Sequence, residues 1–306
     1  MERPARRVLH VCYCCDDREA ATRLFVEHLG MLDFMGTAAE PSDGSILGIE
    51  RDVVAPTRFV YDARGPRTSP AIEVQEWIDP PLLGTPVDDP TRGGIQALGV
   101  AVPAVADTTE RLLAAGCVVR GGGTSPFDGR PWTTLRDPAG VTLDLVEDAT
   151  LPAGGSRLHH LRVTCTDLAV SRRWYEGVGF DAVGPATAIT DASFLDGALT
   201  AVEADALRLR LPDEPFEVLL SAWHAPPAHG RHVEEANHAG LYRAALGVDD
   251  TRASYAEMLA AGWAFDQPPT SIVMRGTPVP EMWICFLRDP DGVPFELVQR
   301  PRDAFR

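Results

Sequence analysis

The segment LRDPDGVPFELVQ, residues 287–299, decides the fold, because its pattern also occurs 152 residues earlier (287 minus 135). The counterpart is LRDPAGVTLDLVE, residues 135–147. Each segment predicts a short strand, an Asp-Pro-x-Gly turn and an alternating last strand. A pattern repeated at this distance predicts a duplicated domain.

The starts of the two halves also match. VLHVCYCCDD (residues 8–17) and LHHLRVTCTD (residues 158–167) each place a histidine seven residues before an aspartate, His10 before Asp17 and His160 before Asp167. Each aspartate precedes apolar residues at helical spacing, and a glycine ends the stretch. This predicts a strand and then a helix that begins at an aspartate N-cap.

A second strand and helix follow in each half. IQALGVAV (95–102) and LYRAALGV (241–248) predict strands, and both following helices end at Ala-Ala-Gly. Each half is therefore expected to be α+β, with two βαβββ units that form a curved sheet whose concave face binds ligands. The predicted domains are residues 1–150 and 157–306, separated by a segment rich in Pro, Gly and Ser.

Composition excludes several classes of protein. The formal charge of −16 disfavours nucleic acid and anionic lipid as partners. No apolar run approaches the roughly 20 residues that a membrane span needs. A cytoplasmic protein is expected, with its six cysteines reduced because no CxxC pair occurs. The sequence contains no lysine, which excludes lysine Schiff-base chemistry.

Polar residues lie between apolar neighbours at matching strand positions of the two halves. Successive side chains of a strand face opposite sides, so we expect these residues to line the concave faces. An isolated glutamate in a strand is often only an outward polar residue, but the recurrence in both halves favours a site. The matched pairs are His10 and His160, Glu73 and Glu217, and Asp144 and Glu296.

Together, the histidine-to-aspartate spacing and the DPDGVPFEL ending resemble the vicinal oxygen chelate superfamily. This superfamily includes glyoxalase I, extradiol dioxygenases, methylmalonyl-CoA epimerase and the fosfomycin and bleomycin resistance proteins. The resemblance implies a tandem duplication of glyoxalase-like domains. It also implies that metal ligands come from four strand positions in each half, which are the three matched pairs and the strand that opens the second unit. That third position departs from the family pattern, because Ala97 and Arg243 stand there.

In the first half, the resemblance leaves His10, Glu73 and Asp144 as candidate metal ligands, with Cys12 facing the same way. One imidazole and two carboxylates suit Fe(II), Mn(II), Zn(II) or Ni(II). The alternative is a relic cleft whose carboxylates are only hydrogen-bonded or solvated.

In the second half, Arg243 and Arg162 are expected to share the concave face with His160, Glu217 and Glu296. A guanidinium competes with a cation for carboxylates, which favours a metal-free cleft. There Arg243 would bridge the glutamates, or bind a substrate anion while His160 moves a proton and Glu296 assists catalysis. Arg162 and Glu217 are then candidate substrate contacts.

The connection HAPPAHGRHVEEANHAG (residues 224–240) holds four histidines, and His238 could supply a missing ligand. A mobile surface loop is the more economical interpretation, because histidines in such segments seldom form a site. Tryptophans are expected to form apolar walls or core. The set is Trp77, Trp132, Trp223 and Trp283.

Two main hypotheses follow for function. The first is a metabolic enzyme that uses one divalent metal ion on an oxygenated, possibly aromatic substrate, in dioxygenase, isomerase or lyase chemistry. The second is a metal-free protein that sequesters an aromatic small molecule, as a resistance protein does. A metal-free enzyme using His160 and Arg243 is a third. In each case the partner is a small molecule, and the chain is a monomer or a homodimer.

Overall fold

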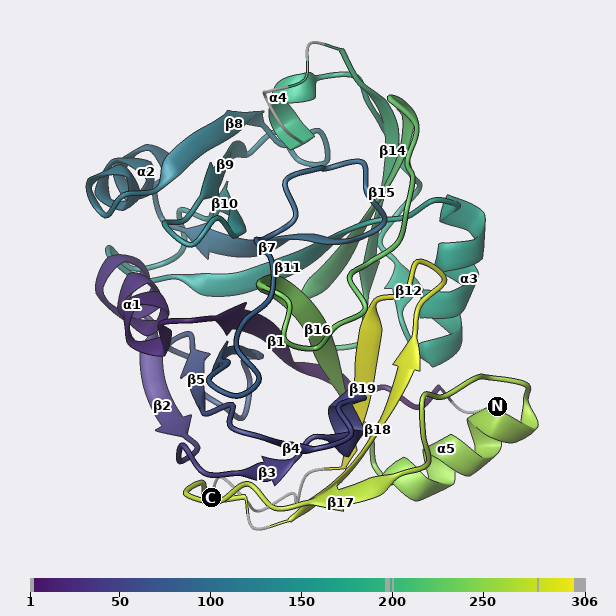
Figure 1. Ribbon diagram of the computed structural model, residues 1–306. Helices are drawn as coiled ribbons and strands as arrows, with labels where there is room; N and C mark the ends of the chain where they lie inside the picture. The colour runs from purple at the N-terminus through teal and green to yellow at the C-terminus, as the bar shows by residue number, and fades with distance from the viewer. Residues whose placement is uncertain (1–2, 196–198, 200, 280, 300–306) are drawn as a thin grey trace.

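The repeated sequence pattern folds into four similar units, two in each half of the chain (Figure 1). The computed structural model describes residues 3–195, 199, 201–279 and 281–299. The first unit contains β1 (Arg7–Cys15), α1 (Arg18–Arg23), the π-helix η1 (Leu24–His28), β2 (Leu32–Gly36), β3 (Ser42–Asp43), the 3₁₀-helix η2 (Ser45–Leu47), β4 (Asp52–Val53), β5 (Thr57–Tyr61) and β6 (Ala71–Glu76). The second contains β7 (Gly94–Val102), α2 (Val105–Ala114), β8 (Val118–Thr124), β9 (Pro131–Arg136) and β10 (Thr142–Glu147).

The second half repeats this order. The third unit contains β11 (Arg157–Thr164), α3 (Leu168–Val178), β12 (Asp181–Ala182), β13 (Thr187–Ile189), α4 (Ala192–Leu195), β14 (Glu203–Arg210) and β15 (Glu217–Ala225). The fourth contains β16 (Gly240–Gly247), α5 (Thr251–Ala260), β17 (Thr270–Ile272), β18 (Met282–Arg288) and β19 (Pro294–Gln299). The predicted α+β class and the repeated order of elements are both present.

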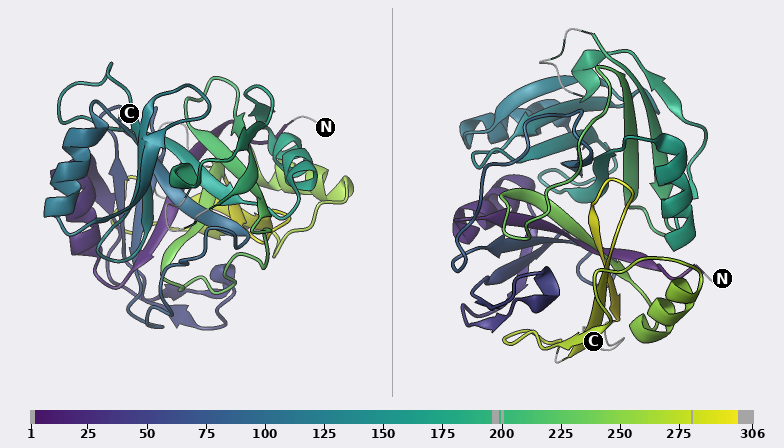
Figure 2. Two further views of the ribbon diagram at one scale, coloured as in Figure 1. Left: turned by 90° about the horizontal axis from the view of Figure 1, so that it is seen from above. Right: turned by 45° about the vertical axis from the view of Figure 1, so that its right-hand side comes forward.

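Helices α1 and α3 begin where the aspartate N-caps predict. Asp17 accepts a hydrogen bond from the Ala20 amide at 2.8 Å, and Asp167 accepts from Ala169 and Val170 at 2.9 Å each. These side chains satisfy amides that have no partner within the first helical turn. The helices lie on the outer flanks, α1 beside α2 and α3 beside α5 (Figure 2). Among the described residues, no helix has the length and apolar character to span a bilayer.

Each of the two large sheets takes one unit from each half of the chain. The β1 sheet has the order β17-β18-β19-β16-β1-β6-β5-β2, which joins the first unit to the fourth. The β7 sheet has the order β12-β14-β15-β11-β7-β10-β9-β8, with β13 on β14, which joins the second unit to the third. Antiparallel pairs link the units, β1 with β16 and β11 with β7. Each curved sheet is therefore built from both halves.

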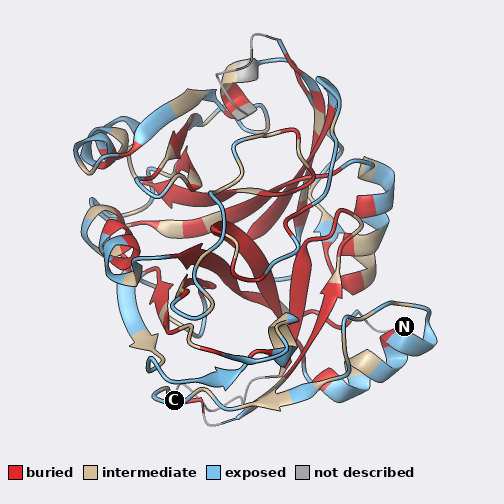
Figure 3. Cartoon of the chain, viewed as in Figure 1, coloured by how far each residue is buried: buried red, intermediate tan, exposed pale blue. Residues whose placement is uncertain are grey.

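The apolar sides of the central strands form one core cluster that includes residues of all four units. Val11, Leu98, Leu161 and Leu297 represent the units, and each is at most 1% exposed. Figure 3 shows the central strands of both sheets as buried. Since alternate residues of these strands fill the core, the intervening polar residues face the concave sides.

Candidate functional site

Four neighbouring strands of the β1 sheet each contribute one charged or titratable side chain to the floor of a pocket. His10 comes from β1, Glu73 from β6, Arg243 from β16 and Glu296 from β19. Glu73 lies between Ile72 and Val74, and Glu296 lies between Phe295 and Leu297, all of which belong to the core. Strand alternation therefore turns these carboxylates into the pocket, as the sequence predicts.

The histidine and the two glutamates converge. His10 Nε2 lies 3.3 Å from Glu73 Oε2 and 3.6 Å from Glu296 Oε2. One donor atom from each residue lies within 4.8 Å of the other two, and all three residues are buried. Although buried, His10 Nε2 makes no hydrogen bond to the described part of the chain. The two carboxylates therefore face this nitrogen at ion-pair distance without forming a hydrogen bond to it, which leaves its lone pair or proton available to a further group.

Arg243 occupies the fourth corner and joins the carboxylates. Its Nη2 donates to Glu73 Oε2 at 2.8 Å, and its Nε donates to Glu296 Oε1. Its Nη1 donates to Gln75 Oε1 at 3.1 Å and to the Cys12 sulfur at 3.2 Å. Cys12 thus lies beside the group as a neighbour of Arg243.

Protonation in this group follows from burial and from mutual attraction. Burial lowers the pKa of His10, but the Glu73 and Glu296 carboxylates outweigh this effect and raise it above 6.5. Burial raises the pKa of Glu296, but Arg243 and His10 outweigh this effect and lower it to about 2. Glu296 is therefore an anion at neutral pH.

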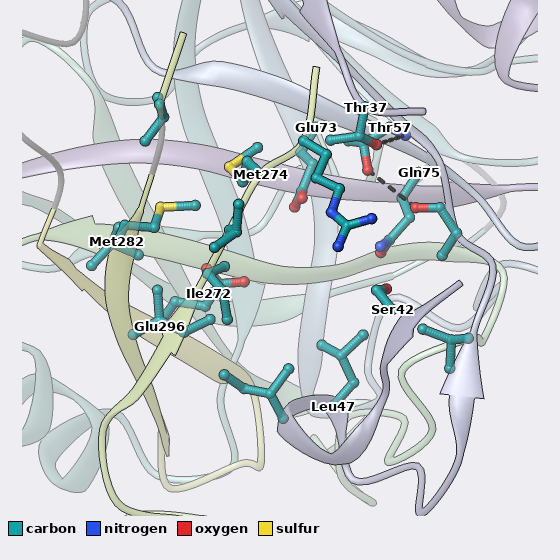
Figure 4. Close-up of a pocket in the computed structure, with 18 of the residues that line it drawn as sticks. Thr37, Ser42, Leu47, Thr57, Glu73, Gln75, Ile272, Met274, Met282 and Glu296 are labelled. Atoms are coloured by element: carbon teal, nitrogen blue, oxygen red, sulfur yellow. Dashed lines mark hydrogen bonds between the residues drawn. The ribbon is translucent and has the colours of Figure 1, made fainter. Parts of the chain in front are cut away.

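Above this floor lies the β1 pocket, a cavity of about 510 Å³. Figure 4 shows Met282 and Ile272 on the side of the pocket where Glu296 lies, and Thr37 and Thr57 on the side of Gln75. Further apolar lining residues are Leu9, Met35, Phe59, Ile284 and Phe286. The volume suits a small organic molecule, and the mixture of apolar walls and few polar groups is typical of ligand sites.

The sequence prediction missed most of the pocket walls. They include residues 37–55, which contain the β3–β4 hairpin, and residues 270–279 after α5. Irregular segments of this kind lack the periodicity that identifies strand faces.

In the β7 sheet, a second buried group forms around Asp144, which we call the β11 cluster. Arg162 donates to both oxygens of Asp144, from Nε at 2.8 Å and Nη2 at 3.1 Å. Thr134 donates to Oδ1 at 2.8 Å, and His160 Nε2 lies 3.2 Å from Oδ2. Burial raises the pKa of Asp144, but Arg162 and His160 outweigh this effect and lower it to about 2.

Aromatic side chains fill the space over the β11 cluster. Trp132 stacks on His160 with ring centroids 5.0 Å apart, and Phe194 packs on Trp132 at 4.7 Å. Arg208 holds Glu217 through two hydrogen bonds of 2.7 and 2.8 Å. The remaining cavity is about 10 Å³, which is too small for an organic ligand.

The structure changes the predicted grouping of the candidate residues. Asp144 does not lie with His10 and Glu73, and Glu296 takes that place. Likewise, Arg243 bridges Glu296 to Glu73 and not to Glu217. The physical reason is the strand order, since β10 pairs with β7 whereas β19 pairs with β16. Each group therefore combines residues of both halves: His10 and Glu73 lie with Arg243 and Glu296, and Asp144 lies with His160 and Arg162.

None of the four histidines in the 224–240 connection lines the β1 pocket. His224 pairs with Asp205 and His229 with Asp89, at 3.0 and 2.9 Å on the surface. His232 differs from the expected mobile residue, because it is 5% exposed and its Nε2 lies 2.7 Å from the Tyr242 carbonyl oxygen. The suggestion that His238 completes a metal site therefore has no support in the geometry.

Three of the tryptophans, Trp77, Trp132 and Trp223, are core residues at 3 to 4% exposure. Trp283 instead stacks under the Arg252 guanidinium, at 4.6 Å from its ring centroid. None of the four lines the β1 pocket.

Residues 157–297 match the family model of the Glyoxalase/Bleomycin resistance protein/Dioxygenase superfamily. The second half of the chain therefore belongs to this superfamily. The resemblance inferred from the repeated motifs is confirmed. No curated protein matches the chain in sequence.

Solved structures show that the whole chain has the fold of a two-domain glyoxalase. Glyoxalase I from Zea mays aligns with a TM-score of 0.69 and 17% identity, over 96% of this chain and 92% of that one. A variant of the same enzyme gives 0.68 and 18%, over 97% and 94%. A dioxygenase candidate from Bacillus subtilis subsp. subtilis str. 168 gives 0.63 and 13%, over 98% and 86%. At these identities, the likeness to the solved structures establishes the fold and not the reaction.

The donor set of the β1 pocket fits a divalent metal ion of the kind that this superfamily implies. A buried imidazole nitrogen lacks a hydrogen bond, and two carboxylates lie within 4.8 Å of it. One nitrogen and two oxygen donors suit Fe(II), Mn(II), Zn(II) or Ni(II). Arg243 lowers the affinity, because its charge lies beside both carboxylates.

Proposed function

We propose that this chain is an enzyme of small-molecule metabolism whose active site is the β1 pocket. In this proposal His10, Glu73 and Glu296 hold one divalent metal ion. The observation that carries it is the convergence of these three donors at the base of a cavity of about 510 Å³, with His10 Nε2 left without a hydrogen bond. Dioxygenase, isomerase and lyase chemistry all use such a site.

The side chains around this group have separate tasks. A bound divalent ion would polarise an oxygen atom of the substrate. Arg243 adds a permanent positive charge beside that position, which favours an enolate, phenolate or carboxylate oxygen. Gln75 and Glu73 hold the guanidinium in place at 3.1 and 2.8 Å. The apolar walls keep water away from the floor and strengthen these electrostatic effects.

His160, Arg162 and Glu217 receive a structural role in this proposal. Each has a charged or ring partner within the β11 cluster, and the space beside them is filled. Asp144 is the buried counter-ion of Arg162. The cluster is a relic of the duplicated cleft that now contributes to stability.

Metal analysis of untagged protein tests the assignment, using the matched positions of the two sheets. Wild-type protein is expected to contain stoichiometric metal, and His10→Ala and Glu296→Gln are expected to lose it. His160→Ala and Asp144→Asn are the controls and are expected to keep it. Metal retained by His10→Ala, or lost from folded His160→Ala, would contradict the proposal.

A metal-free binding protein is the second candidate, and one observation favours it. Arg243 already pairs with both glutamates, so their charges are partly neutralised without a metal ion. Wild-type protein without metal, combined with tight binding of an aromatic compound, would select this candidate. In both proposals the partner is a small molecule, the location is the cytoplasm and the chain is a monomer or homodimer.

A further inference from the structure

The open side of the β1 pocket is bordered by two chain segments, and both carry charge. Glu40, Asp43 and Asp52 lie in or beside the β3–β4 hairpin, and Arg275 follows β17. All four are exposed lining residues of the pocket. Arg275 lies 3.4 Å from Glu40, so one ion pair connects the two segments. Figure 1 shows β3 and β17 along the same side of the molecule.

The charges of the pocket do not balance. Its described lining residues include five carboxylates, Glu40, Asp43, Asp52, Glu73 and Glu296, against Arg243, Arg275 and the titratable His10. Arg243 pairs with Glu73 and Glu296 at the floor of the pocket, and Arg275 pairs with Glu40. Asp43 and Asp52 thus have no cationic partner among the described residues. The adjacent Arg51 is engaged with Asp79 through hydrogen bonds of 2.7 and 3.0 Å.

Asp43 and Asp52 are also directly opposite each other. They are register partners in the two-stranded sheet of β3 and β4. Like charges directly opposite on paired strands destabilise the pairing. The Asp43 carboxylate also accepts a hydrogen bond from the Ser45 amide at 2.9 Å, which keeps it an anion. A cationic group bound near both carboxylates would be attracted to them, whereas an anionic group would be repelled.

Between this acidic rim and the floor, the walls are apolar and adaptable. Met35, Met274 and Met282 contribute thioether side chains, next to Phe59 and Ile284. Methionine is flexible and polarisable, and it packs well against aromatic rings of different shapes. The walls therefore favour an apolar body over a chain of hydroxyl, amide or phosphate groups.

We infer that the ligand of the β1 pocket is an apolar molecule with a basic nitrogen at its outer end. Its apolar body lies against the methionine wall, and its nitrogen lies near Asp43 and Asp52. This inference rests on the proposed function only in placing the ligand in the β1 pocket. It excludes substrates attached to a polyanionic carrier, since a phosphate-rich tail would lie at the acidic rim.

Three probes that share a biphenyl body and differ in the charge of the head group test the charge preference by calorimetry at about 20 mM ionic strength, where charges are weakly screened. They are 4-biphenylmethyl-trimethylammonium, 4-biphenylmethanol and 4-biphenylsulfonate. The ammonium is expected to bind about tenfold more tightly than the sulfonate, with the alcohol between them. Asp43→Asn/Asp52→Asn is expected to bring the ammonium and sulfonate affinities close together.

The control variant Asp107→Asn/Glu110→Gln makes the same charge change at exposed positions of helix α2. This helix belongs to the second unit, whose strands lie in the β7 sheet. It is expected to keep the wild-type preference. Tighter binding of the sulfonate, a preference that survives Asp43→Asn/Asp52→Asn, or no binding of any probe would overturn the inference. The quaternary ammonium and the sulfonate are poor metal ligands, so the comparison holds with or without metal. A failure of the metal assignment is therefore distinguishable from a failure of this inference.

Discussion

At the scale of single residues, the two sheets use the same side-chain types from different strands. In the β1 pocket the arginine is Arg243 on β16, and β1 carries the small Cys12 beside it. In the β11 cluster the arginine is Arg162 on β11, and its register partner on β7 is the small Ala97. Each buried carboxylate group thus keeps one guanidinium and one small residue that makes room for it. At corresponding positions of the two halves, Cys12 matches Arg162 and Ala97 matches Arg243, so the arginine and the small residue have changed places.

Asp144→Asn is expected to destabilise the protein. Arg162 is 2% exposed and donates to both oxygens of Asp144, and removal of that negative charge from a buried ion pair costs about 3 kcal/mol. Because the pKa of Asp144 falls from 3.8 to about 2, its stabilising effect is present above pH 3.8 and is lost as the pH falls through 2. Urea unfolding between pH 7 and pH 2 measures both effects.

In the same experiment, the exposed Asp107→Asn serves as a control with little expected change. An unchanged free energy of unfolding for Asp144→Asn at pH 7 would show that Arg162 finds another partner.

At the scale of strands, sequence alternation predicted which side chains share a face. Leu161, Val163 and Cys165 enter the core, whereas His160 and Arg162 lie on the other face of β11. This works because side chains alternate strictly along a strand. The strand partners were not predictable in the same way, because two repeats of equal pattern allow pairing within or between halves. The filling by Phe194 was also missed, since it comes from α4, a helix of four residues that is too short to show a helical pattern in the sequence.

The close approach of β7 to β11 supports a prediction at this scale. Gly99 is the register partner of His160, and a Cβ there would lie 2.0 Å from His160 Nδ1. Gly99→Ala is therefore expected to lower the free energy of unfolding by about 2 kcal/mol through overpacking. In a His160→Ala background the same substitution is expected to cost much less, because the ring is gone. Equal costs in both backgrounds, measured by urea unfolding, would contradict this contact.

At the scale of the whole molecule, the composition and the repeat predicted an α+β chain of two similar halves. They did not predict that strands of one half pair with strands of the other in both sheets. Strand pairs β1–β16 and β11–β7 both cross from one half to the other. The sequence contains no signal for this crossing, because long-range pairing depends on how the whole chain closes its sheet edges.

Separate expression of residues 1–150 and 151–306 tests the crossing. Each fragment would expose two long central strands as edges, so each is expected to aggregate or dimerise when alone. Co-expression is expected to give a one-to-one complex with the circular dichroism of the intact chain. Size-exclusion chromatography with urea unfolding provides the measurement. A monomeric fragment with the stability of the intact chain would show that the halves are independent.

The first and fourth units share the β1 sheet, and this limits which parts of the chain can be lost without loss of the pocket. The β1 pocket takes His10 and Glu73 from the first unit and Arg243 and Glu296 from the fourth, so the loss of either unit would remove half of its floor. Trp132, by contrast, lies at the filled β11 cluster and is not a lining residue of the β1 pocket. The first and fourth units are thus bound to a shared cavity, whereas the second and third units meet in a closed cluster where changes act on stability.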